Sequence, residues 1–212
     1  MRLRYDQLSF EQKLAAGRVV EEHVAAYMRK RGWWVVPSYE FSGKENDHAP
    51  KMVAPPGWRD LVLPDLQGFK DRRLVWLEVK SKTCCTLHHI SNDLPVTGIA
   101  KRLYLHYQQV EIETGGTVYL LFVHEKENEI RGDALTCLRT YEHHDWPDDD
   151  MDRGGTIFWE FSRIPLWGSR EELGLPVGFS MPRAHRMAPL VAMRETPQQA
   201  FDFGPPKRRV PA

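Results

Sequence analysis

Cysteine is scarce in this chain of 212 residues, which has only Cys84, Cys85 and Cys137. Three cysteines are too few for a disulfide framework, so a reducing compartment fits better. The sequence also has no apolar run long enough to span a bilayer, and its first residues lack the apolar segment of a signal peptide. We therefore expect a soluble, cytoplasmic protein that has no membrane partner.

Net charge is also absent, because 29 Lys and Arg residues balance 29 Asp and Glu residues. No global field then attracts nucleic acid, and any basic binding surface must be local. With 42% hydrophobic residues, the chain can build one domain with a full core, which we predict for residues 1–175. Residues 176–212 contain seven prolines and six Lys or Arg against two acidic residues, which predicts a proline-rich basic tail, flexible or loosely docked.

Hydrophobic periodicity and breaker residues predict an α/β order of elements along the chain. Ser9 is a suitable N-cap for a first helix, and Gly32 ends it. The apolar run from Val118 to Val123 is typical of a strand buried on both faces. The predicted helices cover residues 9–31, 98–113 and 133–142, and the predicted strands cover residues 33–36, 61–66, 74–80, 118–123 and 156–164.

Two short motifs on neighbouring strands supply a carboxylate pair and a lysine. Pro64-Asp65 is followed, thirteen residues after the aspartate, by Glu78-Val79-Lys80. Strand alternation puts Glu78 and Lys80 on one face, side by side. Carboxylates hold hard divalent cations, and a nearby lysine can orient or activate water and stabilise negative charge. The two motifs therefore predict a Mg²⁺- or Mn²⁺-dependent site that hydrolyses phosphodiesters.

These motifs, with the predicted element order, resemble the PD-(D/E)XK nuclease superfamily. The resemblance covers roughly residues 15–124 and implies a restriction-endonuclease-like αβββαβ core, with a mixed central sheet flanked by helices. In this chain an extra C-terminal strand and the tail would follow. The resemblance implies that Asp65 and Glu78 bind metal, that the backbone carbonyl of Val79 is a further ligand, and that Lys80 belongs to the active site.

Many members of this superfamily also have a glutamate on the first helix, and this chain has two candidates. Leu14, Gly17, Glu21, Val24 and Met28 share one helical face by their 3-4-3-4 spacing, whereas Glu22 lies on the neighbouring, more charged face. A carboxylate on a buried stripe needs a reason to be there, so we assign Glu21 to the site and to the metal. Gly17-x-x-x-Glu21 also resembles the opening of Holliday-junction-resolvase-like members.

Three further side chains are predicted to bind DNA. Lys82 repeats the strand alternation beyond Lys80, and Lys101 lies near the start of the second predicted helix. Tyr104-x-x-x-Gln108 resembles, in reverse order, a Gln/Tyr element of exonuclease-like members, so Gln108 is expected to line the site. Cys84-Cys85-x-x-His88-His89 has poor geometry for zinc and predicts a polar loop.

Taken with the resemblance, the residues predict a deoxyribonuclease of replication, recombination or repair that is encoded by a phage. Two other classes of function stay open: a catalytically silent DNA-binding module on the same fold, and an accessory protein docked to a sliding clamp. The second rests on residues 198–203, which resemble clamp-binding peptides. Candidate partners are thus DNA, a sliding clamp and a second copy of the chain. RNA as substrate is an undecided variant.

Overall fold

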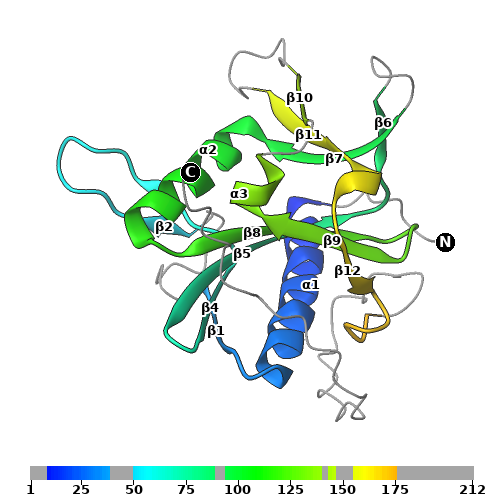
Figure 1. Cartoon of the computed structure of the whole chain (residues 1–212), viewed down its shortest axis with the longest axis horizontal. Coiled ribbons are helices and arrows are strands. Elements are labelled where there is room, and N and C mark those ends of the chain that lie inside the picture. The colour runs from blue at the N-terminus through cyan, green and yellow to red at the C-terminus, as the bar shows by residue number, and fades with distance from the viewer. Residues whose placement is uncertain (1–8, 39–49, 89–93, 140–142, 147–154, 176–212) are drawn as a thin grey trace, which may run out of the picture.

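The computed structural model describes residues 9–38, 50–88, 94–139, 143–146 and 155–175 (Figure 1). Its helices are α1 (Phe10–Lys30), α2 (Lys101–Thr114) and α3 (Leu135–Leu138), with a 3-10 turn at Phe161–Arg163. Its strands are β1 (Trp34–Pro37), β2 (Lys51–Met52), β3 (Leu61–Val62), β4 (Leu66–Lys70), β5 (Arg73–Lys82), β6 (Thr86–His88), β7 (Leu94–Ala100), β8 (Thr117–His124), β9 (Glu129–Ala134), β10 (His143–Trp146), β11 (Thr156–Glu160) and β12 (Leu166–Ser169).

A mixed sheet of six strands forms the centre of the molecule, in the order β1-β4-β5-β8-β9-β12. Only the pairing of β5 with β8 is parallel, and the chain crosses between these strands through α2. The elements α1, β1, β4, β5, α2 and β8 reproduce the predicted αβββαβ order, and helices flank the mixed sheet. The predicted fold class is therefore confirmed.

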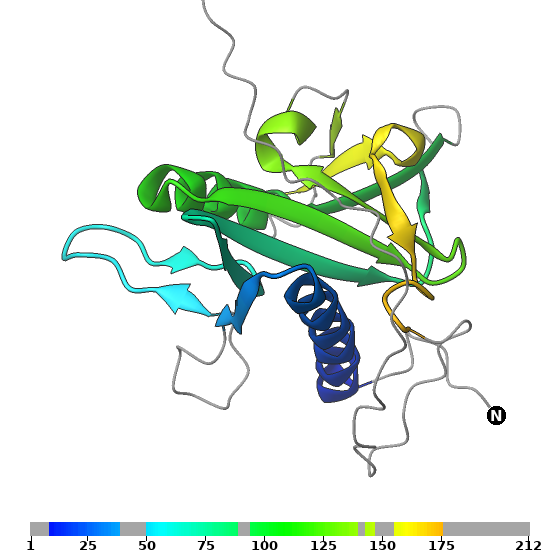
Figure 2. The same cartoon turned by 60° about the horizontal axis from the view of Figure 1, so that its bottom comes forward.

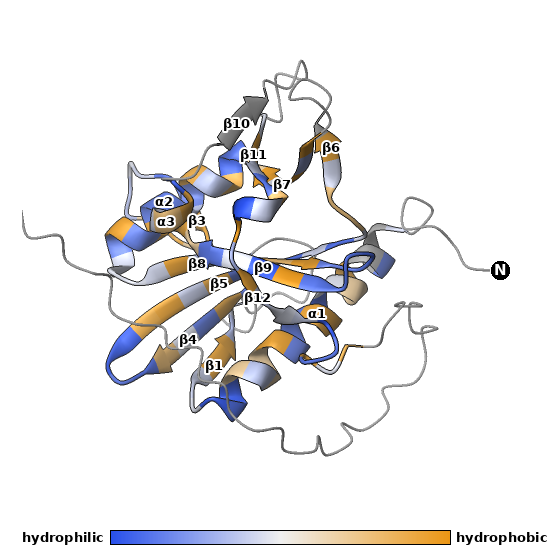
Figure 3. Ribbon diagram, turned by 45° about the vertical axis from the view of Figure 1, so that its right-hand side comes forward, coloured by the Kyte–Doolittle hydropathy of each residue, from blue (hydrophilic) through white to orange (hydrophobic). Residues whose placement is uncertain are grey.

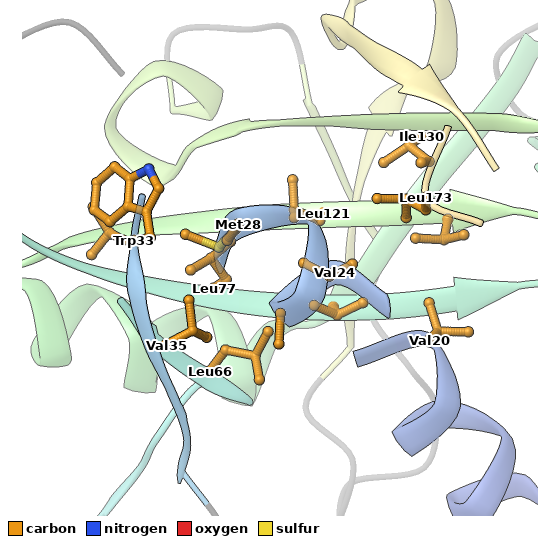
Figure 4. Close-up of a cluster of buried hydrophobic side chains, with 14 of the residues drawn as sticks. Val20, Val24, Met28, Trp33, Val35, Leu66, Leu77, Leu121, Ile130 and Leu173 are labelled. Carbon is orange, nitrogen blue, oxygen red and sulfur yellow. The ribbon is translucent and has the colours of Figure 1, made fainter. Parts of the chain in front are cut away.

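Helix α1 covers one face of the central sheet, as Figure 2 shows. Its buried residues Val20, Val24 and Met28 pack against Leu77 and Leu121 of the sheet in one apolar cluster (Figure 4). The helix begins with a capping box in which Ser9 accepts the Gln12 N–H and Gln12 reaches back to the Ser9 backbone. The capping box fixes where α1 begins, and its apolar face fixes which side packs on the sheet. Together they determine which side chains of α1 face the sheet.

The opposite face of the central sheet is covered by α2 and by a second sheet in the order β10-β11-β7-β6. A second apolar cluster joins these elements. It contains Tyr107 and Val110 of α2, Trp76 and Phe122 of the central sheet, and Trp159 of β11. Because β8 separates the two clusters, its residues 118 and 120–123 are buried on both faces, as the apolar run predicts.

The hairpin of β4 and β5 differs from its prediction in two ways. The predicted strand 61–66 is interrupted, because Pro64 and Asp65 lie between β3 and β4; proline has no N–H for a sheet ladder. The predicted turn 68–72 is shorter, with Asp71 and Arg72 at positive φ between the paired residues Lys70 and Arg73. Figure 3 shows this turn as a hydrophilic stretch between hydrophobic stretches of the two strands.

The second predicted helix starts at residue 98, whereas α2 starts at Lys101, and the difference has a steric reason. Gly98 lies in β7, where a Cβ atom would come within 2.2 Å of the Ile157 carbonyl oxygen of β11. The backbones meet so closely that only glycine fits, and α2 starts three residues later at Lys101. Its end is as predicted, with Gly115 in the left-handed conformation.

Several shorter elements also differ from the sequence prediction. Strands β2, β6, β7, β9, β10 and β12 were not predicted, and the predicted helix 133–142 is reduced to α3. The expected extra strand is present as β11, which ends at Glu160, and β12 adds a further strand at the edge of the central sheet. The tail and the clamp-like segment 198–203 lie outside the described residues, so the domain boundary stays a prediction.

Candidate active site

Asp65 lies where the chain enters β4, directly beside the middle of β5. Leu66 pairs with Leu77, which sets Asp65 next to Glu78 on the neighbouring strand. The side-chain atom Oδ2 of Asp65 accepts the backbone N–H of Val79 at 2.8 Å. Because the strand is interrupted at Pro64 and Asp65, the side-chain carboxylate of Asp65, and not a backbone carbonyl, accepts this hydrogen bond from β5.

Glu78 is the most deeply buried carboxylate of the site, with 1% of its side chain exposed. Its Oε1 forms an ion pair with Nζ of Lys80, which lies two residues along the same strand. Its Oε2 is buried and has no hydrogen-bond partner among the residues that the structure describes. A buried ionised oxygen without a partner is unfavourable, and this atom is suited to binding a cation.

Repulsion from neighbouring carboxylates appears in the proton affinities of Glu21 and Asp65. Burial, and then the charge of Glu78, raise the pKa of Glu21 from 4.5 to about 7, against opposing effects of Lys80 and Arg18. Burial and the charges of Glu78 and Glu21 also raise the pKa of Asp65 well above its usual range, although Lys80 and the Val79 N–H oppose them. The structure thus brings Glu21, Asp65, Glu78 and Lys80 into one interacting group.

Lys80 is held in its charged form. Burial lowers its pKa, but the negative charges of Glu78, Asp65 and Glu21 and the hydrogen bond to Glu78 outweigh this effect and raise the pKa overall. Its side chain keeps 31% of its surface exposed, so Lys80 is less deeply buried than its partner Glu78. A permanently charged lysine can bind a phosphate oxygen or orient water beside it.

Glu21 and Glu22 lie on different faces of α1, as the helical spacing predicts. Glu21 is partly buried and interacts with Glu78, Asp65 and Lys80, whereas Glu22 is exposed. Gly17 lies one turn earlier against this side chain, and a Cβ atom there would be in ordinary van der Waals contact with Oε1 of Glu21, at 3.6 Å. Whether Glu21 binds metal stays a prediction.

Tyr107 of α2 is a residue of this group that the motif analysis missed. It is almost fully buried, and burial, the charges of Glu78 and Asp65 and a hydrogen bond to Glu78 raise its pKa. The available signal was the spacing of Tyr104, Tyr107 and Val110, which are the buried residues of α2. A tyrosine on a buried helical face usually has a hydrogen-bond partner for its hydroxyl.

The three predicted DNA-binding residues lie at different places. Lys82 ends β5 beside Lys80, and burial and the charge of Lys80 lower its pKa. Lys101 opens α2, where its backbone N–H bonds to the Gly155 carbonyl oxygen at 2.9 Å. Gln108 is half-buried beside Tyr107. Their contacts with DNA stay predictions.

A cage of side chains closed around a cation is not present in the described part of the chain, since no three His, Cys, Asp or Glu residues gather closely enough to hold a metal ion. A Mg²⁺ site does not need such a cage, because this cation keeps several waters and often takes only one or two carboxylates. The free Oε2 of Glu78 and the repelling Asp65 and Glu21 fit that kind of site.

Solved structures similar to this chain include two nucleases. One is Hjc, a Holliday junction resolvase of Archaeoglobus fulgidus, with 12% identity over 69% of this chain and 89% of that chain, at a TM-score of 0.42. The other is D212, a nuclease from a fusselovirus, with 11% identity over 82% of this chain and 92% of that chain, at a TM-score of 0.38. No protein-family model and no curated protein matches the sequence.

Among the residues that the structure describes, no helix is both long enough and apolar enough to cross a membrane.

Proposed function

We propose that the chain is a Mg²⁺- or Mn²⁺-dependent deoxyribonuclease that hydrolyses phosphodiester bonds. The observation that supports this most is the electrostatic interaction among Glu21 of α1, Asp65 just before β4, and Glu78 and Lys80 of β5. A structural ion pair would need one acid for one lysine. Here Glu78 raises the pKa values of Glu21 and Asp65, and these three acids beside one lysine leave negative charge that a divalent cation would neutralise.

Asp65 and Glu78 would hold the metal, with the Val79 carbonyl as a further ligand and Glu21 bound directly or through water. When bound, the metal would supply Lewis-acid stabilisation of the phosphate oxygens and lower the pKa of a coordinated water. Asp65 is fixed for this role by the Val79 N–H, and Glu78 by Lys80. Two carboxylates on neighbouring strands and a backbone oxygen form an all-oxygen set, which suits Mg²⁺ or Mn²⁺.

Lys80 has the second role in the proposed reaction. Its ammonium orients the attacking water and stabilises the charge that develops on the phosphate oxygens. Its side chain is partly exposed although it pairs with buried Glu78, so a phosphodiester approaching from solvent would meet it. The resemblance of the motifs to a nuclease superfamily supports a role in replication, recombination or repair.

The proposal is tested by incubating the purified chain with Mg²⁺ or Mn²⁺ and a panel of single-stranded, duplex, flapped and branched DNAs. We expect cleavage of at least one DNA, with none in EDTA. Binding of DNA without cleavage under every metal condition would favour the catalytically silent binding module. A chain lacking residues 198–212 should cut as the full chain does, whereas the accessory-protein alternative requires that the tail be essential.

A further inference from the structure

Residues 51–62 form an arm that projects from the body of the molecule. Its two strands, β2 and β3, pair with each other, and Figures 1 and 2 both show the connecting loop extending away from the central sheet. The base of the arm is closed by Leu63, which follows β3 and donates its N–H to the Pro50 carbonyl oxygen at 2.8 Å. Asp65 lies only two residues further along the chain.

The loop of the arm exposes large apolar side chains instead of burying them. Trp58 is 70% exposed and Val53 is 81% exposed. The loop nevertheless has a defined shape, because Trp58 donates its N–H to the Pro55 carbonyl oxygen at 3.0 Å and Oδ1 of Asp60 accepts the Ala54 N–H at 3.1 Å. An indole held out in water on a shaped loop is a feature that a ligand with a flat apolar surface would stabilise.

Basic groups gather at the root of the arm. Lys51 of β2 and Arg102 of α2 both act on the ring of His106, and after burial they are the causes that lower its pKa. Nδ1 of His106 accepts the Val62 N–H at 3.4 Å, so the neutral ring has its proton on Nε2. His106 immediately precedes Tyr107, which bonds to Glu78. The root therefore offers two exposed cations, Lys51 and Arg102, around His106.

We infer that the arm binds the DNA strand next to the bond that is cut, with Trp58 stacked on an unpaired base and with Lys51 and Arg102 on backbone phosphates. This inference rests on the proposed nuclease function and adds to it a substrate class, which is DNA with unpaired nucleotides near the scissile phosphate. An exposed aromatic beside cations is the combination that binds single strands, because every base has a π-face and every nucleotide a negative charge.

The length of the arm limits where the unpaired base lies. The seven residues from Trp58 to Asp65 span at most about 25 Å when fully extended. At about 3.4 Å per nucleotide along one strand, the stacked base lies within roughly seven nucleotides of the cleaved bond. A DNA unpaired only at a more distant position should be bound as a plain duplex is.

The test measures binding in EDTA, so that it does not depend on cleavage. Fluorescence anisotropy compares a labelled single strand with the duplex of the same sequence, for the wild type, Trp58→Ala and Trp58→Phe. We expect Trp58→Ala to weaken single-strand binding by about 5- to 150-fold, with much less effect on the duplex, and Trp58→Phe to retain most of the affinity. Trp34→Ala is the matched control, because Trp34 is 79% exposed on β1 at the edge of the central sheet.

The basic root has a separate signature. The double variant Lys51→Gln, Arg102→Gln should weaken binding of both DNAs and reduce the salt dependence of single-strand affinity by about 0.7 for each phosphate that the protein no longer neutralises.

The inference is overturned if the wild type binds no DNA, if Trp58→Ala binds the single strand as the wild type does, or if Trp34→Ala loses as much affinity. A changed oligomeric state in Trp58→Ala with unchanged DNA binding would make the arm a protein interface instead. If the wild type cuts no DNA but Trp58→Ala still weakens single-strand binding, only the proposed nuclease function is contradicted.

Discussion

Oδ2 of Asp65 lies 2.8 Å from the backbone nitrogen of Val79, and this one hydrogen bond ties the start of β4 to β5 beside Glu78. The bond fixes two carboxylates next to each other although they repel, since it stabilises the ionised form of Asp65. The sheet thereby stabilises an arrangement that the charges alone would oppose, which is typical of a site that is organised for a cation.

Asp65→Asn should separate the effect of the Asp65 charge from the effect of its hydrogen bond with the Val79 N–H. The asparagine oxygen can still accept the Val79 N–H, so we expect an unchanged fold and cleavage reduced by about 10²- to 10⁴-fold. Asp65→Ala should lose cleavage and also lower the free energy of unfolding by about 1–3 kcal/mol, because the N–H of buried Val79 loses its partner. Cleavage rates and urea denaturation measure the two effects, and equal stability in both variants would contradict the structural role of the bond.

Glu21→Gln and Glu22→Gln form a matched pair on one turn of α1. Only Glu21 interacts with Glu78, so we expect Glu21→Gln to lower metal-dependent cleavage by at least about tenfold and Glu22→Gln to leave it unchanged. Initial rates over a range of Mg²⁺ concentrations give the comparison. If only Glu22→Gln loses activity, the assignment of the helical face is wrong.

The raised pKa of Glu21 should also appear in the stability of the metal-free protein. Its pKa is about 7 in the folded chain and near 4.5 when unfolded, so the folded state binds more protons between these values and the free energy of unfolding falls as pH rises through that window. Relative to the wild type, Glu21→Gln should therefore gain stability between pH 4.5 and pH 8. Thermal melting in EDTA checks this, and a constant difference in Tm would contradict it.

Tyr107→Phe removes one hydroxyl from a buried ring. The ring still fills the second apolar cluster, so we expect the fold to persist, while Glu78 loses the hydrogen bond that orients it. Partners of metal ligands typically contribute 10- to 100-fold in metal affinity, so the Mg²⁺ concentration for half-maximal cleavage should rise by about that factor. Tyr104→Phe, on the same buried face one turn away, is the control. An equal rise in both variants would indicate a packing effect.

The core of the fold could be predicted because each of its elements has a local signal. Ser9 and Gly32 mark the ends of α1, and the apolar run of β8 is unambiguous. The site was accessible for the same reason, since Glu78 and Lys80 share a face by strand alternation alone. Glu21 followed from helical spacing.

The missed elements depend on contacts between distant parts of the chain. Gly98 has the sequence context of a helix start, and only its close approach to Ile157 places it in a strand. Strand β12 has four residues and pairs with β9 across an irregular register, so no alternation marks it. Tyr107 was missed because its partner, Glu78, lies on another element. Periodicity shows that a residue is buried, whereas its partner is determined by tertiary packing.

Cleavage by Lys80→Ala, compared with the wild type and Lys82→Ala, tests the central claim most directly. All three proteins should have the same circular dichroism spectrum, because both lysines are partly exposed at the end of β5. We predict that Lys80→Ala does not cut any DNA of the panel with Mg²⁺ or Mn²⁺, while Lys82→Ala cuts with weakened DNA binding. Equal cleavage by the wild type and Lys80→Ala would contradict the proposed active site.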